Sequence, residues 1–107
     1  MKILFDQGTP KPLKNYLHPH AIFSAFQMGW SMRKNGDLIT AAESAGFDLL
    51  ITTDKNLKYQ QNLGNRKIAI IVLMAPYWPV VRPSVHLVQD AVARAAAGTY
   101  IEVEFFG

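Results

Sequence analysis

Three aspartates stand where their side chains could act together on one ion. Asp6 follows the apolar run at residues 3–5, and Asp54 ends a second run that begins at Asp48. Function in parallel sheets gathers just beyond the carboxyl ends of the strands, so neighbouring strands that both end in aspartate would bring two carboxylates together. Such a pair repels itself unless a cation or a proton lies between. A hard divalent ion with oxygen ligands, Mg²⁺ or Mn²⁺, resolves that repulsion, and Asp37 lies where it could join.

Geometry removes the other carboxylates. Asp48 begins the strand that Asp54 ends, and six residue steps of roughly 3.3 Å place the two about 20 Å apart, on opposite rims of the sheet. The rest are expected on helices or on the polar face of a late strand: Glu43, Asp90, Glu102 and Glu104. The expected catalytic and metal-binding residues are therefore Asp6, Asp37 and Asp54.

Each of the three also has a structural interpretation to weigh. Asp37, in the first turn of an expected helix, could complement the helix dipole, which is worth about 0.3–1 kcal/mol. Asp54 could be the N-cap of the short helix after it. Asp6 is harder to explain in this way, because Thr9 already supplies the cap of the next helix.

The elements that must position these side chains alternate along the chain. Strands are expected at residues 3–5, 21–25, 48–54, 68–73 and 100–105. Helices are expected at residues 10–17, 36–45, 56–62 and 83–97, with Asn35 as the N-cap of the second. Right-handed crossovers make this order a three-layer α/β/α sandwich with a mostly parallel sheet of about five strands. The last strand alternates apolar and polar residues, which is typical of an edge strand.

Composition limits the class of protein. The 107 residues are half hydrophobic, which predicts a single domain over residues 1–107. No apolar run approaches the roughly 20 residues of a membrane helix, and three apolar residues after Lys2 are too few for a signal peptide, so a cytoplasmic location is expected. Cysteine is absent, which removes disulfides and thiolate zinc sites.

Positive charge is concentrated in the first part of the chain. Residues 1–67 hold nine Lys or Arg against five Asp or Glu, whereas the remaining residues hold two against three. A basic first part suits a polyanionic partner. An ordinary solvated surface explains the same distribution.

Several segments together resemble the PIN-domain family. They are Asp6, Asn35–Glu43 and Leu50–Leu57, accompanied by Gly29-Trp30 and Lys58–Leu63. They are most similar to small bacterial PIN-like proteins related to toxin–antitoxin ribonucleases, and the resemblance spans most of residues 2–73. It implies a metal-dependent phosphodiesterase that cleaves RNA and is held by an antitoxin protein, with Asp6, Asp37 and Asp54 as the metal ligands.

The chain departs from the family pattern at two positions. Gln27 stands where the family commonly has an acidic residue, and Asn56 stands where a second one often follows the Asp54 position. Fewer carboxylates bind an ion more weakly. The alternative function is a catalytically weak or inactive PIN-like module that binds RNA or a protein partner.

Further residues are candidates for contacts with RNA. Lys34, Lys55 and Lys58 could hold phosphates, or could be solvated surface lysines. Gln27, Asn56 and Gln61 could contact RNA or position water, although polar residues in such places need no such role. The aromatic side chains Trp30, Tyr77 and Trp78 could stack on bases, cover the core, or lie in a homodimer contact.

Other chemistries find less support. There is no Gly-x-x-x-x-Gly-Lys loop and no Gly-x-Ser-x-Gly motif, so neither a P-loop nor a hydrolase nucleophile is indicated. A phosphoacceptor domain of the receiver type would want paired acids after the first strand, but Gln7 follows Asp6.

Overall fold

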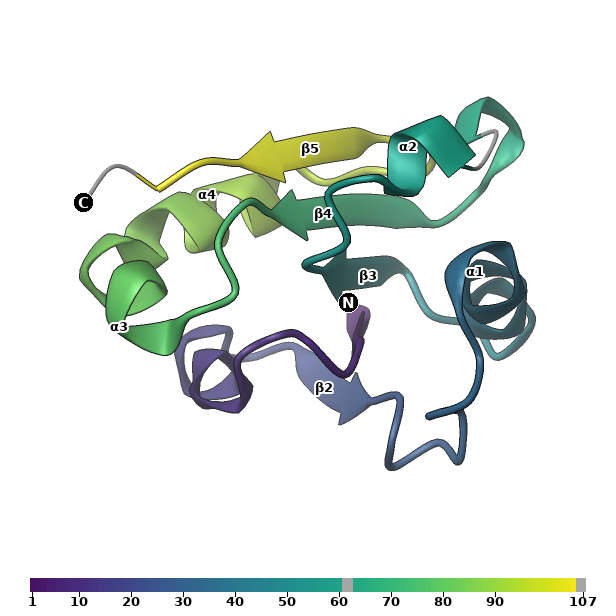
Figure 1. Cartoon of the computed structure of the whole chain (residues 1–107), viewed down its shortest axis with the longest axis horizontal. Helices are drawn as coiled ribbons and strands as arrows, with labels where there is room; N and C mark the ends of the chain where they lie inside the picture. The colour runs from purple at the N-terminus through teal and green to yellow at the C-terminus, as the bar shows by residue number, and fades with distance from the viewer. Residues whose placement is uncertain (61–62, 106–107) are drawn as a thin grey trace.

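The computed structural model describes residues 1–60 and 63–105. It contains a five-stranded sheet in the order β2-β1-β3-β4-β5 (Figure 1). Every neighbouring pair of strands is parallel. The strands are β1 (Lys2–Phe5), β2 (Ala21–Ser24), β3 (Leu49–Thr52), β4 (Ala69–Leu73) and β5 (Tyr100–Val103). The predicted α/β class is confirmed, and the last strand does lie at an edge.

The sheet has an apolar cluster on each face, because successive side chains of a strand point to opposite sides. Ile71 and Leu73 of β4 belong to one cluster, and Ile70 and Val72 belong to the other. Every residue of β3 and β4 is buried. This explains why the central strands are continuous hydrophobic runs, as expected for a parallel sheet covered on both faces.

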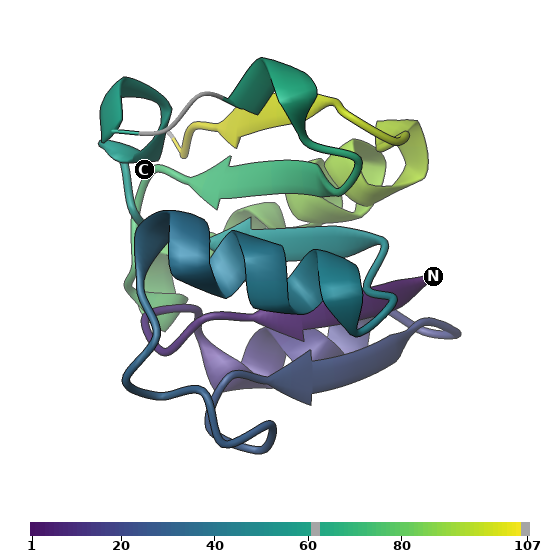
Figure 2. The same ribbon diagram turned by 90° about the vertical axis from the view of Figure 1, so that its right-hand side faces the viewer.

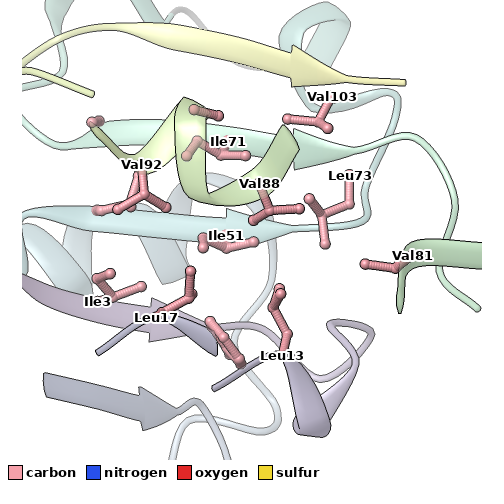
Figure 3. Packing of buried hydrophobic residues seen from close by; sticks show 14 residues of the cluster. Ile3, Leu13, Leu17, Ile51, Ile71, Leu73, Val81, Val88, Val92 and Val103 are labelled. Atoms are coloured by element: carbon pink, nitrogen blue, oxygen red, sulfur yellow. The ribbon is translucent and has the colours of Figure 1, made fainter. Parts of the chain in front are cut away.

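Helical segments cover both faces. The first face carries η1 (Lys11–Tyr16), α3 (Trp78–Val81), η3 (Arg82–Ser84) and α4 (Val85–Arg94), as the packing of Leu13, Val81 and Val88 shows (Figure 3). The second face carries α1 (Asn35–Ser44) and α2 (Leu57–Gln60), which lie in front of the sheet in Figure 2. A short turn of helix, η2 (Leu63–Asn65), precedes β4.

The helix starts differ from the predictions. The helix after Pro10 is a 3₁₀ helix with Pro10 at its cap position, so the prediction that Thr9 caps it is wrong. Asn35 is the first residue of α1 and Lys34 is its cap, so the prediction of an Asn35 cap is also wrong. Neither cap residue makes a side-chain capping hydrogen bond.

The sequence predicts an apolar stripe of Leu38, Ala41, Ala42 and Ala45 on α1, and the structure shifts this stripe toward Ile39. Leu38, Ile39 and Ala42 are buried, whereas Ala41 is only partly buried. The larger side chain of Ile39, fully buried against the sheet, contributes more apolar area than alanine does. After the helix, Gly46 adopts φ 81°, the left-handed conformation expected of a glycine stop.

Within the described residues, no helix is both long and apolar enough to cross a membrane.

Candidate functional site

The connections that leave β1 and β3 run to opposite faces of the sheet. After β1 the chain enters η1, whose Leu13 packs in the first cluster. After β3 it enters α2, whose Leu57 packs in the second. Because β1 and β3 are neighbours, their diverging ends open a crevice of the kind in which parallel α/β sheets bind ligands. Asp6 and Asp54 stand on its two sides.

The Asp6 carboxylate is held by several donors. Its Oδ1 accepts hydrogen bonds from the backbone N–H groups of Gly8 and Thr9, both at 3.1 Å, and lies 2.8 Å from the Thr9 hydroxyl. Its Oδ2 accepts a hydrogen bond from the Thr52 hydroxyl. Thr9 is buried, and its Oγ1 also lies 2.8 Å from the carbonyl oxygen of Ile51. Asp6 therefore organises the turn after β1, which is a structural role that the sequence interpretation did not give it.

Asp54 is joined to the same network. Its backbone N–H donates to the Thr52 hydroxyl at 3.1 Å, and its Oδ1 accepts from the backbone N–H of Asn56 at 3.1 Å. Thr52 is buried and stands between the two aspartates, donating to Asp6 and accepting from Asp54. The Asn56 contact is a local turn ahead of α2, in line with the structural alternative considered for Asp54.

Asp6 and Asp54 line one pocket of about 200 Å³, which we call the aspartate pocket. Its remaining lining is a mixture of polar, basic and apolar groups: Gln7, Gly8, Ala25, Trp30, Ser31, Arg33, Lys34, Leu38, Leu50, Thr52 and Leu57. The structure thus brings together two of the three predicted ligands. Asp48 accepts a hydrogen bond from the Lys2 N–H at the start of β1. It therefore lies on the opposite rim of the sheet from Asp6 and Asp54, as the length of the strand predicted.

Asp37 is not gathered with them. Its side chain is 63% exposed and forms an ion pair with Arg33, Oδ1 to Nη1, at 3.0 Å. It is not among the residues that line the aspartate pocket. Among residues 1–60 and 63–105, no three His, Cys, Asp or Glu side chains form a group that could hold a metal ion.

The predicted RNA contacts are scattered. Lys34 lines the aspartate pocket, whereas Lys55 and Asn56 are exposed outside its lining. Gln27 lines a separate hollow on the other side of Asp6. Gln61 lies outside the described residues.

Lys58 is committed to an ion pair across the second face of the sheet. Its Nζ lies 3.0 Å from Oε2 of Glu102 on β5, and the Tyr100 hydroxyl donates to the same oxygen at 3.0 Å. The hydrogen bond to Glu102 raises the pKa of Lys58, and the bonds from Lys58 and Tyr100 hold the pKa of Glu102 below its usual range. Burial, followed by the bond to Glu102, raises the pKa of Tyr100. This pair fastens α2 to β5, and Lys58 is not among the residues that line the aspartate pocket.

The aromatic residues also separate. Trp30 lines the aspartate pocket and packs edge-on against Phe47, with ring centroids 6.0 Å apart. Trp78 packs near Tyr16, at 5.6 Å on the other face, and Tyr77 is 68% exposed. Of the three, Trp30 alone lines the aspartate pocket.

Sequence reasoning missed two contributors to the pocket. Arg33 stands four residues before Asp37, the spacing of a helical ion pair, and that spacing was the signal that could have linked them. Thr52 precedes Asp54 by two residues. Its role depends on the pairing of β3 with β1, and no local signal reveals it.

Asp6 and Asp54 are the carboxylates of this pocket that could hold a divalent ion, and Asp37 does not complete a three-carboxylate centre. Among the residues that the structure describes, Oδ2 of Asp6 accepts a hydrogen bond from the Thr52 hydroxyl alone, and Oδ2 of Asp54 has no hydrogen-bond partner. Magnesium usually keeps several waters and is bound through one or two carboxylates plus substrate phosphates. Two such oxygens beside Arg33 and Lys34 match that requirement.

Comparisons with protein-family models, with curated proteins and with solved structures found no match to this chain.

Proposed function

We propose that the protein is a metal-dependent ribonuclease in which Asp6 and Asp54 hold a single Mg²⁺ or Mn²⁺ ion. The observation that supports this most is the position of the two carboxylates in one pocket between β1 and β3, where Thr52 bonds the Asp6 carboxylate and the backbone N–H of Asp54. The resemblance to PIN-like proteins, carried by Asp6 and residues 35–43 and 50–57, adds the substrate class, RNA.

The residues of the pocket have separate roles in this proposal. The four donors on Asp6 hold its carboxylate in one orientation, so little reorganisation is needed when an ion binds. Arg33 and Lys34 carry the positive charge that holds the scissile phosphate and the charge that develops on it. When bound, the ion would polarise the phosphate and lower the pKa of a coordinated water.

Asp37 acts on Arg33 in this proposal and does not bind the ion in the arrangement described. Its carboxylate lies 3.0 Å from the Arg33 guanidinium, so it keeps that side chain at the rim of the pocket. Because both groups are largely exposed, the pair is weak and solvent-screened. A role for Asp37 as a third ligand would require this pair to open.

The proposal extends to the location and the partners of the protein. The resemblance favours a toxin that acts in the cytoplasm and is restrained by an antitoxin protein, with a homodimer as a further assembly. The second candidate function is a PIN-like module that binds RNA or a protein without cutting. It is favoured by the exposed, paired state of Asp37 and by Gln27 and Asn56 in place of acids.

The test is a calorimetric titration of Mn²⁺ into the wild-type protein and into Asp6→Asn, Asp54→Asn, Asp37→Asn and Asp90→Asn. We expect the first two substitutions to weaken binding by about tenfold or more, since even groups that only support a ligand are worth that much. Asp37→Asn and Asp90→Asn should change binding by less than about twofold, because both carboxylates are exposed partners of an arginine four residues away. Asp90→Asn is the matched control.

Cleavage of a labelled RNA is measured on the same variants, with circular dichroism to show that each is folded. Loss of Mn²⁺-dependent cleavage in Asp6→Asn and Asp54→Asn would support the nuclease. A wild-type protein that binds RNA but neither binds Mn²⁺ nor cuts would overturn it in favour of the binding module. A loss in Asp37→Asn equal to that in Asp54→Asn would restore the three-carboxylate centre.

A further inference from the structure

A second hollow opens on the β2 side of Asp6. It has a volume of about 520 Å³ and shares Asp6 and Gln7 with the aspartate pocket. Its other lining residues come from β1, the turn after β1, η1, β2 and the turn after β2: Phe5, Thr9, Lys11, Lys14, Ile22, Ser24, Phe26 and Gln27. The two hollows therefore meet at the carboxyl end of β1. We call this one the η1–β2 hollow.

Two lysines, Lys11 and Lys14, outnumber Asp6 among the charged lining residues and give this hollow a net positive charge. Lys11 and Lys14 lie three residues apart on η1, and in a 3₁₀ helix side chains at that spacing are eclipsed on one face. Both are exposed, and within the described chain neither side chain has an ion pair or a hydrogen bond. Two unpaired ammonium groups at the wall of one hollow favour an anionic ligand.

The opposite wall offers a flat ring and a free amide. Phe26 is 74% exposed, which is unusual for so large an apolar side chain. The side-chain Oε1 of Gln27 accepts a hydrogen bond from the Ser24 backbone N–H at 2.9 Å. The backbone N–H of Gln27 donates to the Ser24 hydroxyl at 3.0 Å. That reciprocal pair holds the turn and leaves the Gln27 NH₂ group available to a ligand.

We infer that the η1–β2 hollow is a nucleotide subsite for single-stranded RNA that crosses Asp6 from the aspartate pocket. The inference rests on the proposed function. The phosphate of the nucleotide next to the scissile phosphate lies against Lys11 and Lys14. The base of that nucleotide stacks on Phe26 and accepts a hydrogen bond from the Gln27 side-chain amide. Stacking on an exposed ring requires a base that is free of its own helix, so the substrate is a single strand that extends beyond the cleavage point on the β2 side.

The experiment measures binding of a fluorescent oligouridylate of about eight nucleotides, a length that single-strand sites commonly cover. Fluorescence anisotropy is recorded in EDTA over a range of salt concentrations, so that neither ion binding nor cleavage enters. The test variant is Lys11→Gln/Lys14→Gln, and the matched control is Lys67→Gln/Arg94→Gln. Both remove two positive charges from exposed side chains, but neither control residue lines either hollow.

We expect the test variant to weaken binding by about tenfold or more at low salt and to reduce the slope of log affinity against log salt by about 1.4, the effect of losing two single-strand phosphate contacts. Phe26→Ala should weaken binding by about tenfold, which is a typical loss for one stacked base. The control should follow the wild type. Equal behaviour of the test and control variants would overturn the subsite.

The failure of the subsite and the failure of the nuclease give different results. RNA binding that depends on Lys11 and Lys14 without any Mn²⁺-dependent cleavage would remove the nuclease and leave the subsite. Cleavage that is insensitive to Lys11, Lys14 and Phe26 would remove the subsite and leave the nuclease. A wild-type protein that binds no RNA would remove both.

Discussion

At the scale of single residues, the hydroxyl of Thr52 connects the two halves of the aspartate pocket. It donates to Asp6 and accepts from the Asp54 N–H, and it is 2% exposed. Buried polar groups that lose their partner keep the full cost of desolvation. The pocket therefore depends on a residue that need not touch a ligand.

Thr52→Val should lower the free energy of unfolding by about 1–3 kcal/mol, because the shape is kept while the Asp54 N–H loses its acceptor. Thr52→Ser retains the hydroxyl and should lose less than Thr52→Val does. Urea denaturation followed by circular dichroism measures both. Identical midpoints for the two variants would show that the hydroxyl has no part in stability.

At the scale of elements, Glu43 fastens α1 to the chain that enters β4. Its carboxylate accepts hydrogen bonds from Arg66 at 3.0 Å, from the Lys67 N–H at 2.6 Å and from the Ile68 N–H at 3.3 Å. Arg66 also donates to Thr40 on the same helix. Burial raises the pKa of Glu43, but the bonds from Lys67, Arg66 and Ile68 together lower it below its usual value of 4.5.

Glu43→Gln should cost about 1.5–3 kcal/mol near neutral pH, the range for hydrogen bonds to a charged group. Since the folded-state pKa is lowered, this stabilisation is complete above pH 4.5 and is lost as the pH falls through the folded-state value. Urea denaturation across that range measures the difference from the wild type. Asp90→Asn, which breaks an exposed pair on α4, should cost less than about 0.5 kcal/mol. A difference that grows on acidification would contradict the assignment.

At the scale of the whole molecule, one sheet separates two apolar clusters that must fold together. Ile70 packs toward α1 and Ile71 packs toward α4, although they are adjacent on β4. Because β4 belongs to both clusters, neither layer can form without it.

Ile70→Ala and Ile71→Ala should each lower the free energy of unfolding by about 2–5 kcal/mol. Each substitution leaves a cavity, and the two cavities lie on opposite faces of the sheet. Both should keep a single transition with an unchanged slope against urea. Met32→Ala, at a side chain that is 90% exposed, should stay within about 0.5 kcal/mol. Two separate transitions in either isoleucine variant would show that the layers unfold independently.

The order of elements and the meeting of Asp6 and Asp54 could be predicted from the sequence. Apolar runs such as residues 68–73 identify buried strands, and parallel pairing places the ends of adjacent strands at one edge. This prediction requires the strands of Asp6 and Asp54 to be neighbours, and the pairing of β1 with β3 confirms that they are.

The direction of each side chain could not be predicted in this way. The rotation of α1 about its axis turns Leu38, Ile39 and Ala42 to the sheet, which leaves Asp37 in solvent beside Arg33. Three-dimensional packing sets that rotation, and the helical period alone does not.

By itself, then, the sequence determined the α/β class and the edge of the sheet at which Asp6 and Asp54 lie, because apolar periodicity and the succession of strands and helices along the chain are local properties. Only the tertiary structure decided that Thr52 joins them, that Asp37 pairs with Arg33, and that Lys58 is bound to Glu102. Each of these contacts is set by the side chains that packing brings within reach of one another. The tertiary structure also revealed the η1–β2 hollow, whose walls come from segments that meet only when β2 pairs with β1.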